Sequence, residues 1–175
     1  AMKDCERNYR SLYEIAAAVN SVRTLDGVLG TLAESVTKAL DVKGCSLMLL
    51  GPDQATLEHV AAHGLSVDYV QKGPVAADKS IAEALAGKAV AILDATRDER
   101  IQYPEEARQA GIVSILSVPM KLKEGTIGVV RVYTAEKRQF TEDDTYFVEA
   151  VANLGAIAIE TAKLYEYCRK DNETL

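Results

Sequence analysis

The sequence predicts an α+β domain in which helices cover one face of an antiparallel sheet, and two patterns support this. Short apolar runs come in pairs, at residues 45–50 with 56–62 and at 112–120 with 127–133, and turn residues separate each pair. Such pairs are typical of β-hairpins. Segments with apolar residues three and four positions apart lie toward the two ends of the chain, so the helices are segregated from the strands. A doubly wound parallel sheet would alternate helices and strands instead.

Length and composition agree with one soluble domain built on one hydrophobic core. The chain has 175 residues, of which 48% are hydrophobic and 26% are charged. These fractions are close to the average for soluble globular proteins. The 20 basic and 26 acidic residues give a net charge of −6, which disfavours nucleic acid as a partner because phosphate binding requires clustered Lys and Arg. The sequence has no internal repeat, low-complexity tract or linker, so we expect a single domain over residues 1–175.

Two helices are predicted before the first strand. In residues 1–23, apolar residues recur at steps of four and three, which is the spacing of a helix that packs on another helix. These residues are Cys5, Tyr9, Leu12, Ala16 and Val19. The second helix is expected over residues 25–40, with Thr24 as the N-cap whose hydroxyl accepts a backbone N–H.

The middle of the chain is predicted to contain short elements and a lid. A capping box of Ser80 and Glu83 indicates a short helix, and residues 89–93 are expected to form a strand. Residues 94–111 are polar and irregular, with one or two turns of helix that start at Pro104. Such a loop could act as a lid.

A long helix is predicted over residues 141–170, with Thr141 as its N-cap. It carries two adjacent apolar stripes. The first consists of Phe147, Val151, Leu154, Ala158, Thr161, Tyr165 and Cys168, and the second of Val148, Ala152, Gly155, Ile159 and Ala162. One stripe can cover the sheet, and the other would remain exposed unless it meets a partner helix, so we expect a homodimer through the terminal helices. The alternative is that the whole apolar face packs on the sheet and first helix of the same protomer.

Alternation along residues 127–133 gives the two faces of the sheet different chemistry. One face receives Gly128, Val130 and Val132, and the other receives Ile127, Val129, Arg131 and Tyr133. In the neighbouring strand, Ile115 and Ser117 alternate with Ser114, Leu116 and Val118. We infer that helices pack behind the sheet and that a partly polar cleft lies in front of it. The alternative is that the front face meets solvent, as in many antiparallel sheets.

Residues 111–166 read GIVSILSVPMKLKEGTIGVVRVYTAEKRQFTEDDTYFVEAVANLGAIAIETAKLYE, with a Ser-containing strand, a Val-Pro, a Gly-x-Ile-Gly-Val strand, a Phe-Thr and a terminal helix. This stretch resembles the second half of a GAF domain. Upstream, HVAAHGLS and AILDATRDER resemble a strand that ends in Gly-Leu and an Asp-bearing segment of the same family. The resemblance covers roughly residues 8–168. It implies a PAS-related fold with five to six antiparallel strands, of which five are ordered 2-1-5-4-3. The terminal helices then pack behind the sheet, and residues 24–140 supply the sheet and a front pocket.

The resemblance also implies a function. GAF domains generally act as sensory or regulatory modules, so the expected function is non-enzymatic small-molecule sensing in a bacterial-type cytosolic signalling protein, with ligand state transmitted through the terminal helices. The alternative is a pure dimerisation module with a vestigial pocket. Cyclic-nucleotide-binding members often carry Asn-Lys and Asp-Glu where this chain has Tyr133-Thr134 and Asp144-Thr145, which disfavours that ligand. Residues 94–111 contain no Cys and no Cys-His pair, so a covalently bound bilin is not expected.

Seven residues are predicted to line the ligand site: Arg131, Tyr133, Ser117, Ile115, Ile101, Tyr103 and Asp94. An inward Arg131 is suited to a carboxylate or phosphate, and the alternative is an ion pair with a lid carboxylate such as Asp94 or Asp98. The hydroxyls of Tyr133 and Ser117 could bind the ligand or form hydrogen bonds with other groups of the protein. Tyr103 and Ile101 could close the lid or only anchor the loop that carries them.

Metal and thiol chemistry are not expected. His59 and His63 lie about 13 Å apart along one strand, which is too far to share a metal ion. A GAF-like fold also serves as a free methionine sulfoxide reductase, which needs reactive cysteines around the pocket. Here Cys45 falls in a strand, and Cys5 and Cys168 fall in the terminal helices, so we expect the protein not to be an enzyme.

The pattern of charge predicts a cytoplasmic protein without a membrane partner. The longest uncharged runs, residues 111–120 and 150–159, are ten residues each, whereas a membrane-spanning helix needs about 20. The first twenty residues carry charges throughout rather than a charged start and an apolar block, so they do not match a signal peptide. Three widely spaced cysteines indicate neither a disulfide framework nor a zinc site.

Overall fold

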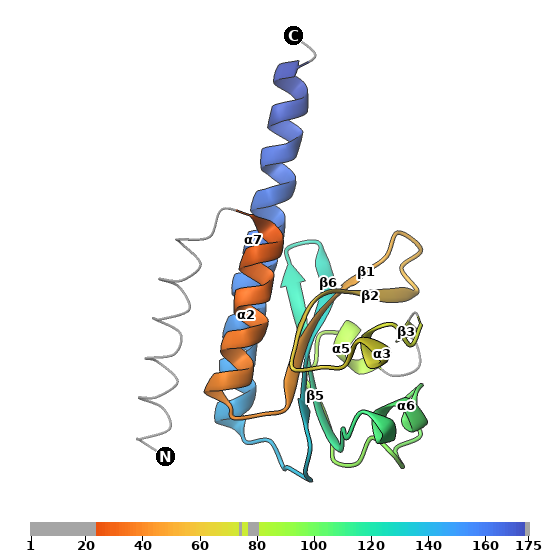
Figure 1. Ribbon diagram of the computed structural model, residues 1–175. Coiled ribbons are helices and arrows are strands. Elements are labelled where there is room, and N and C mark those ends of the chain that lie inside the picture. Colours follow the sequence, from red (N-terminus) through yellow and green to blue (C-terminus); the bar gives the residue numbers. More distant parts are fainter. Residues whose placement is uncertain (1–23, 74, 77–80, 174–175) are drawn as a thin grey trace.

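A six-stranded antiparallel sheet forms the centre of the fold in the computed structural model, which describes residues 24–73, 75–76 and 81–173 (Figure 1). The strands are β1 (Gly44–Leu50), β2 (Thr56–His63), β3 (Val75–Ala76), β4 (Val90–Ile92), β5 (Ser114–Leu122) and β6 (Gly125–Thr134). The helices are α2 (Leu25–Ala39), α3 (Val67–Val70), α5 (Ala82–Leu85), α6 (Pro104–Gln109) and α7 (Glu142–Glu173). The predicted helix over residues 1–23 lies outside the described residues.

The strand order confirms the predicted topology. The order is β3-β2-β1-β6-β5-β4, and every neighbouring pair is antiparallel. When the two-residue strand β3 is left out, the remaining five strands have the expected order 2-1-5-4-3. Strand β3 was not predicted, because a strand of two residues has no periodicity to detect. The predicted α+β class is therefore confirmed.

Helices α2 and α7 form the back layer of the molecule, on one side of the sheet (Figure 1). The side chain of Thr24 accepts a hydrogen bond from the backbone N–H of Gly27 and caps α2, as predicted. The back core joins the two helices to the small apolar face of the central strands. Its fully buried members include Leu32, Val36, Leu47, Val130, Val132, Val148 and Ala152.

The other face of the sheet is covered by α3, α5, α6 and the loops between them (Figure 1). A second cluster of buried apolar residues lies there and includes Met48, Ile115 and Val129 from the central strands. The front face of the central strands therefore does not meet solvent. Helix α6 begins with Pro104 at its first turn, as predicted. Helix α5 has Ile81 as its N-cap with no side-chain hydrogen bond, whereas the expected cap Ser80 lies outside the described residues.

A β-bulge moves Ile127 away from its predicted place on the front face. The register pairs Met120 with Gly128 but Lys121 with Thr126, so Ile127 is an extra residue with no direct partner. It is half-buried and packs against the back cluster. Side chains therefore alternate strictly between the two faces of the sheet only from Gly128 onward in β6.

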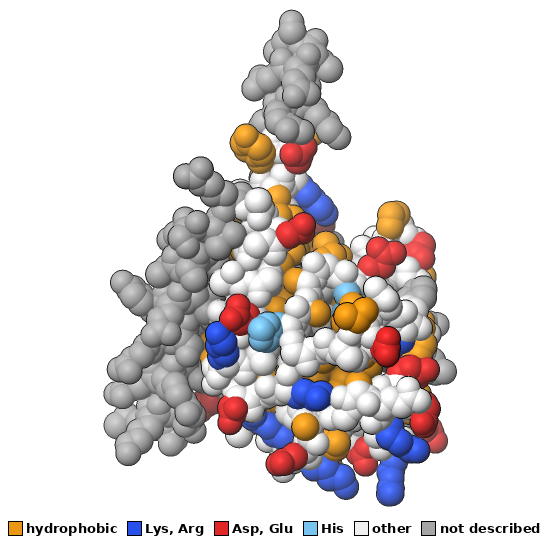
Figure 2. All heavy atoms as spheres, viewed as in Figure 1, with side chains coloured by type: hydrophobic (Ala, Val, Ile, Leu, Met, Phe, Trp, Pro, Cys, Tyr) orange, Lys and Arg blue, Asp and Glu red, His pale blue; other side chains and the backbone are white. Residues whose placement is uncertain are grey.

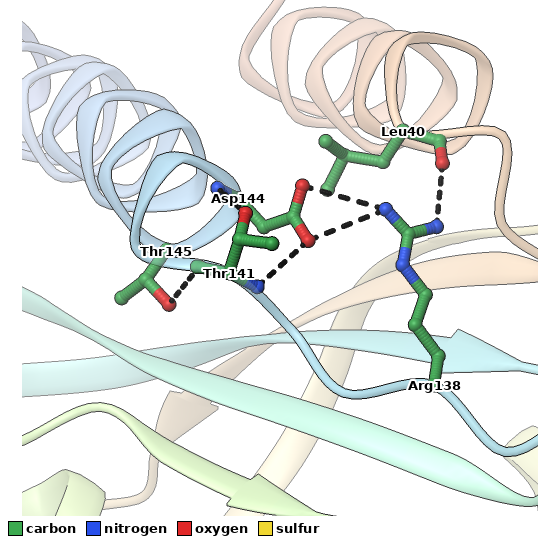
Figure 3. Close-up of polar contacts among 5 residues, drawn as sticks. All are labelled: Leu40, Arg138, Thr141, Asp144 and Thr145. Carbon is green, nitrogen blue, oxygen red and sulfur yellow. Dashed lines mark hydrogen bonds and ion pairs between the residues drawn. The ribbon is translucent and has the colours of Figure 1, made fainter. Parts of the chain in front are cut away.

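Arg138 joins the ends of both back helices to the sheet (Figure 3). Its guanidinium donates to the carbonyl of Leu40, at 2.7 Å, and pairs with the carboxylate of Asp144 at 3.3 Å. Its backbone N–H donates to Ser114 Oγ at 2.9 Å. Thr141 and Asp144 accept each other's backbone N–H, which confirms Thr141 as the start of α7. The C-terminal end of α2 is thereby held against the start of α7.

The fold covers both apolar stripes of α7 and not only one of them. Both predicted stripes are buried or half-buried as far as Ile159, because α7 contacts the sheet and α2 together. Beyond the sheet, α7 projects past the rest of the molecule (Figure 1). The large apolar side chains exposed on this helix are Tyr146, Ile157, Leu164, Tyr165 and Tyr167.

Two glycines offer a matched test of this packing. A Cβ on Gly128 would lie 2.2 Å from the backbone oxygen of Met48, whereas a Cβ on Gly30 would have no atom within 4 Å. We expect Gly128→Ala to lower the free energy of unfolding by about 3 kcal/mol, because the β1 backbone must move. Gly30→Ala should raise it by about 0.5–1 kcal/mol, since alanine favours the helix. Urea unfolding measures both, and equal losses in the two variants would contradict this account.

Candidate ligand-binding site

Arg131 lies in the middle of the front face. It belongs to β6, and its register partners are Ser46 in β1 and Ser117 in β5. The side chains of all three point away from α2 and α7, because they alternate with the residues of the back core. Arg131 is only 3% exposed. The structure therefore places the predicted inward arginine in the interior.

The guanidinium of Arg131 has buried N–H groups without partners. Its Nε and Nη2 atoms are inaccessible and make no hydrogen bond. These two N–H groups lie on one edge of the planar guanidinium and point in parallel, which fits the two oxygens of a carboxylate or phosphate. A buried charge with unmet donors costs several kcal/mol, so this arrangement is unfavourable without a ligand or water.

The lid carboxylates do not pair with Arg131. Asp98 binds Arg100 instead, with 2.8 Å between Oδ2 and Nη2. The predicted site residue Asp94 accepts hydrogen bonds from the backbone N–H and hydroxyl of Thr96, at 3.0 and 2.6 Å. These bonds close a local turn, and they lower the pKa of Asp94 below its usual value. The structure therefore does not bring Asp94 to Arg131.

Two predicted hydroxyl groups do converge on Arg131. Ser117 Oγ and the hydroxyl of Tyr133 are buried and have no partner within hydrogen-bond geometry, and the nearest polar side chains to the Tyr133 hydroxyl include Ser46 and Tyr69. Ser117 faces Arg131 across the β5–β6 ladder, and the ring centroid of Tyr133 lies 5.5 Å from Arg131 Cζ. Burial raises the pKa of the Tyr133 phenol, which is therefore protonated at neutral pH.

His59 belongs to the same cluster, and its place there was not predicted. Its Nδ1 atom is hydrogen-bonded to Ser46 Oγ, and its Nε2 atom is buried without a partner. Burial, with smaller effects from the charges of Lys72 and Arg131, lowers the pKa of His59 to about 4. The imidazole is therefore neutral at pH 7, with one ring nitrogen as donor and the other as acceptor.

Lys72 is a second cation near Arg131 and was also missed. It follows α3, and its Nζ atom lies 3.8 Å from the ring centroid of Tyr69 and donates to the Tyr69 carbonyl at 3.0 Å. Burial and, to a smaller extent, the positive charge of Arg131 lower the pKa of Lys72 to about 8, and Glu106 on α6 acts in the opposite direction. The cluster thus contains two cations, and the nearby acid Glu106 is half-buried.

Aromatic and apolar side chains surround these polar groups. The rings of Tyr69 and Tyr133 meet edge to face, with centroids 5.6 Å apart. The predicted residues Ile115 and Ile101 are buried in the front cluster. Tyr103 is half-buried, and its ring centroid lies 5.5 Å from Lys72 Nζ. Residues of the predicted lid therefore cover the front face, as expected for residues 94–111.

An open groove approaches the cluster from the side of β2. It has a volume of about 390 Å³ and is lined by Leu57, Glu58, His59, Val70, Gln71 and Gly73. His59 belongs both to the groove and to the buried cluster. It is thus the link between the front cluster and this opening.

The structure holds Cys45 away from this cluster. Cys45 is buried among the back-core residues, on the opposite face of the sheet, and burial raises the pKa of its thiol. Cys5 lies outside the described residues, and Cys168 lies toward the end of α7. Among the described residues, no group of three or more His, Cys, Asp or Glu side chains could hold a metal ion. In the same part of the chain, no helix is both long and apolar enough to cross a membrane.

Charged side chains of both signs are interspersed on the molecular face in Figure 2. Apolar side chains are visible on the part of α7 that projects from the body. This face therefore presents mixed charge, while the guanidinium of Arg131 lies inside.

Comparisons with known proteins identify similar domains. A family model described as "GAF domain" matches residues 22–160. The fold is similar to that of the GAF domain of a phosphoenolpyruvate-protein phosphotransferase from Coxiella burnetii, with a TM-score of 0.82, 19% identity, and coverage of 93% of this chain and 98% of that chain. The corresponding domain from Acinetobacter gives a TM-score of 0.78 and 20% identity, with coverage of 91% and 97%.

A third similar structure belongs to an enzyme. Free methionine-R-sulfoxide reductase from Neisseria meningitidis, solved in complex with its substrate, gives a TM-score of 0.75 and 17% identity, with coverage of 90% of this chain and 91% of that chain. At these identities the likeness is one of fold. No curated protein matches the chain.

Arg131 and Arg138 provide a test of whether the buried charge of Arg131 lacks partners. We expect Arg131→Met to raise the free energy of unfolding of the ligand-free protein by about 1–3 kcal/mol, because methionine fills similar space without an unpaired charge. Arg138→Met, the same substitution at an arginine whose hydrogen bonds are made, should lower it by about 1–3 kcal/mol. Urea unfolding of both variants makes the comparison. A loss of 3 kcal/mol or more in Arg131→Met would show that the guanidinium has good partners.

Proposed function

The chain belongs to the GAF domain family, and from this premise we propose that it is a non-enzymatic regulatory module that binds a small anionic ligand around Arg131. GAF domains are signalling and ligand-binding modules. The observation that carries the proposal is the buried guanidinium of Arg131, whose Nε and Nη2 atoms have no partner. An anion between the lid and the sheet would neutralise this charge and accept hydrogen bonds from both N–H groups.

The positions of the thiols support regulation rather than thiol chemistry. A reductase of this fold would need a reactive thiolate beside the bound substrate. Cys45 lies behind the sheet, and burial favours its neutral thiol. The cluster around Arg131 offers hydroxyl, imidazole and amine groups for binding, and Cys45 contributes nothing to it.

The connection between β6 and α7 supports a route for signal transmission. Arg131 lies in β6, and the chain then passes through Arg138 to the start of α7. Because Arg138 also binds the carbonyl of Leu40, a shift of β6 would act on the ends of α2 and α7 together. We propose that ligand state is transmitted in this way to the helices of a cytoplasmic signalling protein of bacterial type.

The projecting part of α7 supports a homodimer. Ile157 and Leu164 are each 58% exposed and lie seven residues apart, so they share one side of the helix. Tyr165 and Tyr167, farther along, are 68% and 71% exposed. A second copy of the same helix would cover these side chains by coiled-coil packing. If the front site were vestigial, this dimer would be the whole function.

A ligand screen tests the sensing function. We expect small anions to raise the melting temperature of the wild-type protein, because a ligand at 100 times its Kd stabilises the folded state by about 2.7 kcal/mol. The same anions should leave Arg131→Met unchanged. Arg108→Met removes an exposed arginine that pairs with Glu105 on α6, and it should respond like the wild type. No thermal shift with any anion, together with unchanged front-face NMR signals, would leave only the dimerisation function.

Charge substitutions on α7 test the dimer. We expect Ile157→Glu and Leu164→Glu to convert a dimer into a monomer in light scattering, because each places a charge in an apolar helix contact. Leu93→Glu is the matched control, since Leu93 is 53% exposed at the end of β4 and away from α7. A wild-type protein that stays monomeric at high concentration would contradict the dimer.

A further inference from the structure

We propose that the ligand around Arg131 is a small monocarboxylate that carries a second, uncharged polar group. This inference rests on the proposed function and names the chemical class of its ligand. It is drawn from the geometry of Arg131, the charges around it and the three neutral polar groups beside it.

The unpartnered edge of Arg131 selects an anion with two oxygens in one plane. The bare Nε and Nη2 atoms are the side-on pair of the guanidinium, and both are buried in the front layer. A carboxylate presents two oxygens at the matching spacing and accepts both hydrogen bonds in the plane of the guanidinium. A phosphate also presents two such oxygens. The shape of the donor pair therefore points to a carboxylate or a phosphate, and the charges around the site distinguish the two.

The charges around the site balance with a single negative charge on the ligand. Arg131 and Lys72 are the two cations, and Glu106 lies close enough to Lys72 to act on it electrostatically. His59, Tyr69 and Tyr133 are the other titratable groups that face the cluster, and all three are neutral at pH 7. Two positive charges and one negative charge leave one uncompensated cation. A monoanion neutralises it, whereas a dianion would add an excess negative charge near Glu106.

The neutral polar groups require a second polar group on the ligand. Ser117 Oγ, Tyr133 OH and His59 Nε2 are all buried without partners. Ser117 is the direct register partner of Arg131, on a strand about 5 Å away. A hydroxyl or oxo group close to the carboxylate could therefore bond to Ser117 while the carboxylate holds Arg131. A plain fatty acid would leave these three groups unsatisfied.

The apolar side chains around the polar groups keep the ligand small. Met48, Ile115 and Val129 are fully buried on the same face of the sheet. The Tyr69 and Tyr133 rings pack against each other beside Arg131. Carbon atoms of a short chain would contact these side chains, and a long chain would have to displace them.

A matched series of probes tests this class by calorimetric titration of the whole chain. The probes are lactate, propionate, lactamide, malonate and inorganic phosphate. We expect lactate to bind about tenfold more tightly than propionate, which lacks the hydroxyl. Lactamide lacks the charge and should bind about a hundredfold more weakly than lactate. Malonate and phosphate should also bind more weakly than lactate.

Variants assign the contacts. Arg131→Lys keeps the charge but loses the paired donors, so it should weaken lactate by about tenfold or more. Ser117→Ala should remove the difference between lactate and propionate while leaving propionate unchanged. Lys72→Gln should weaken the binding of lactate and propionate equally, because both carboxylates lose the same electrostatic attraction. Arg108→Met is the control and should leave all affinities unchanged.

Other outcomes separate this inference from the proposed function. Tighter binding of phosphate or malonate than of lactate, with dependence on Arg131, would overturn the carboxylate class and leave anion sensing intact. Equal binding of lactate and propionate would overturn the second polar group. Lactate binding that persists in Arg131→Met and Arg131→Lys would overturn the site. Failure of every probe, and of every anion in the wider screen, would overturn both proposals.

Discussion

Strand β6 is buried on both faces, and each face has to meet a different physical requirement. Behind the sheet, Val130 and Val132 pack against α2 and α7, and Gly128 allows the β1 backbone to approach closely. In front, Arg131 and Tyr133 carry polar groups into the same low-dielectric interior. Close packing of apolar side chains is sufficient on the back face. On the front face, buried polar groups need hydrogen-bond partners, and the protein alone does not supply all of them.

Arg131 and Arg138 show how differently the fold treats two arginines seven positions apart. Arg138 sits where α2 ends and α7 begins, and its donors are used by Leu40 and Asp144 (Figure 3). Arg131 sits under a complete layer of side chains, yet its Nε and Nη2 have no partner. A structural role explains the first arginine fully. The second contacts the Tyr133 ring but leaves two buried donors without acceptors, and under the proposed function an anionic ligand would offset this cost.

The same strand connects the candidate site to the candidate output. A ligand bound at Arg131 would act on β6, whose continuation leads to Arg138 and then to α7. The part of α7 beside the sheet packs largely against its own core, and the exposed apolar side chains that a partner helix could cover include Ile157, Leu164, Tyr165 and Tyr167. This arrangement separates the functions along one helix. Under the proposed function, the start of α7 would respond to the sheet, and its exposed apolar side chains farther along would contact a partner helix.

The resemblance to GAF domains predicted the strand order, whereas local patterns in the sequence were enough to predict the α+β class, the caps Thr24 and Thr141, and an inward Arg131. Each depends on periodicity or on neighbours a few positions away. The roles of His59 and Lys72, the bulge at Ile127 and the local turn at Asp94 could not be predicted. They depend on the register between strands and on how α3 and the lid pack over the sheet, which are contacts between residues distant in the chain. The sequence thus places a cation on the front face, and only the tertiary structure decides which groups surround it and which leave it unpaired.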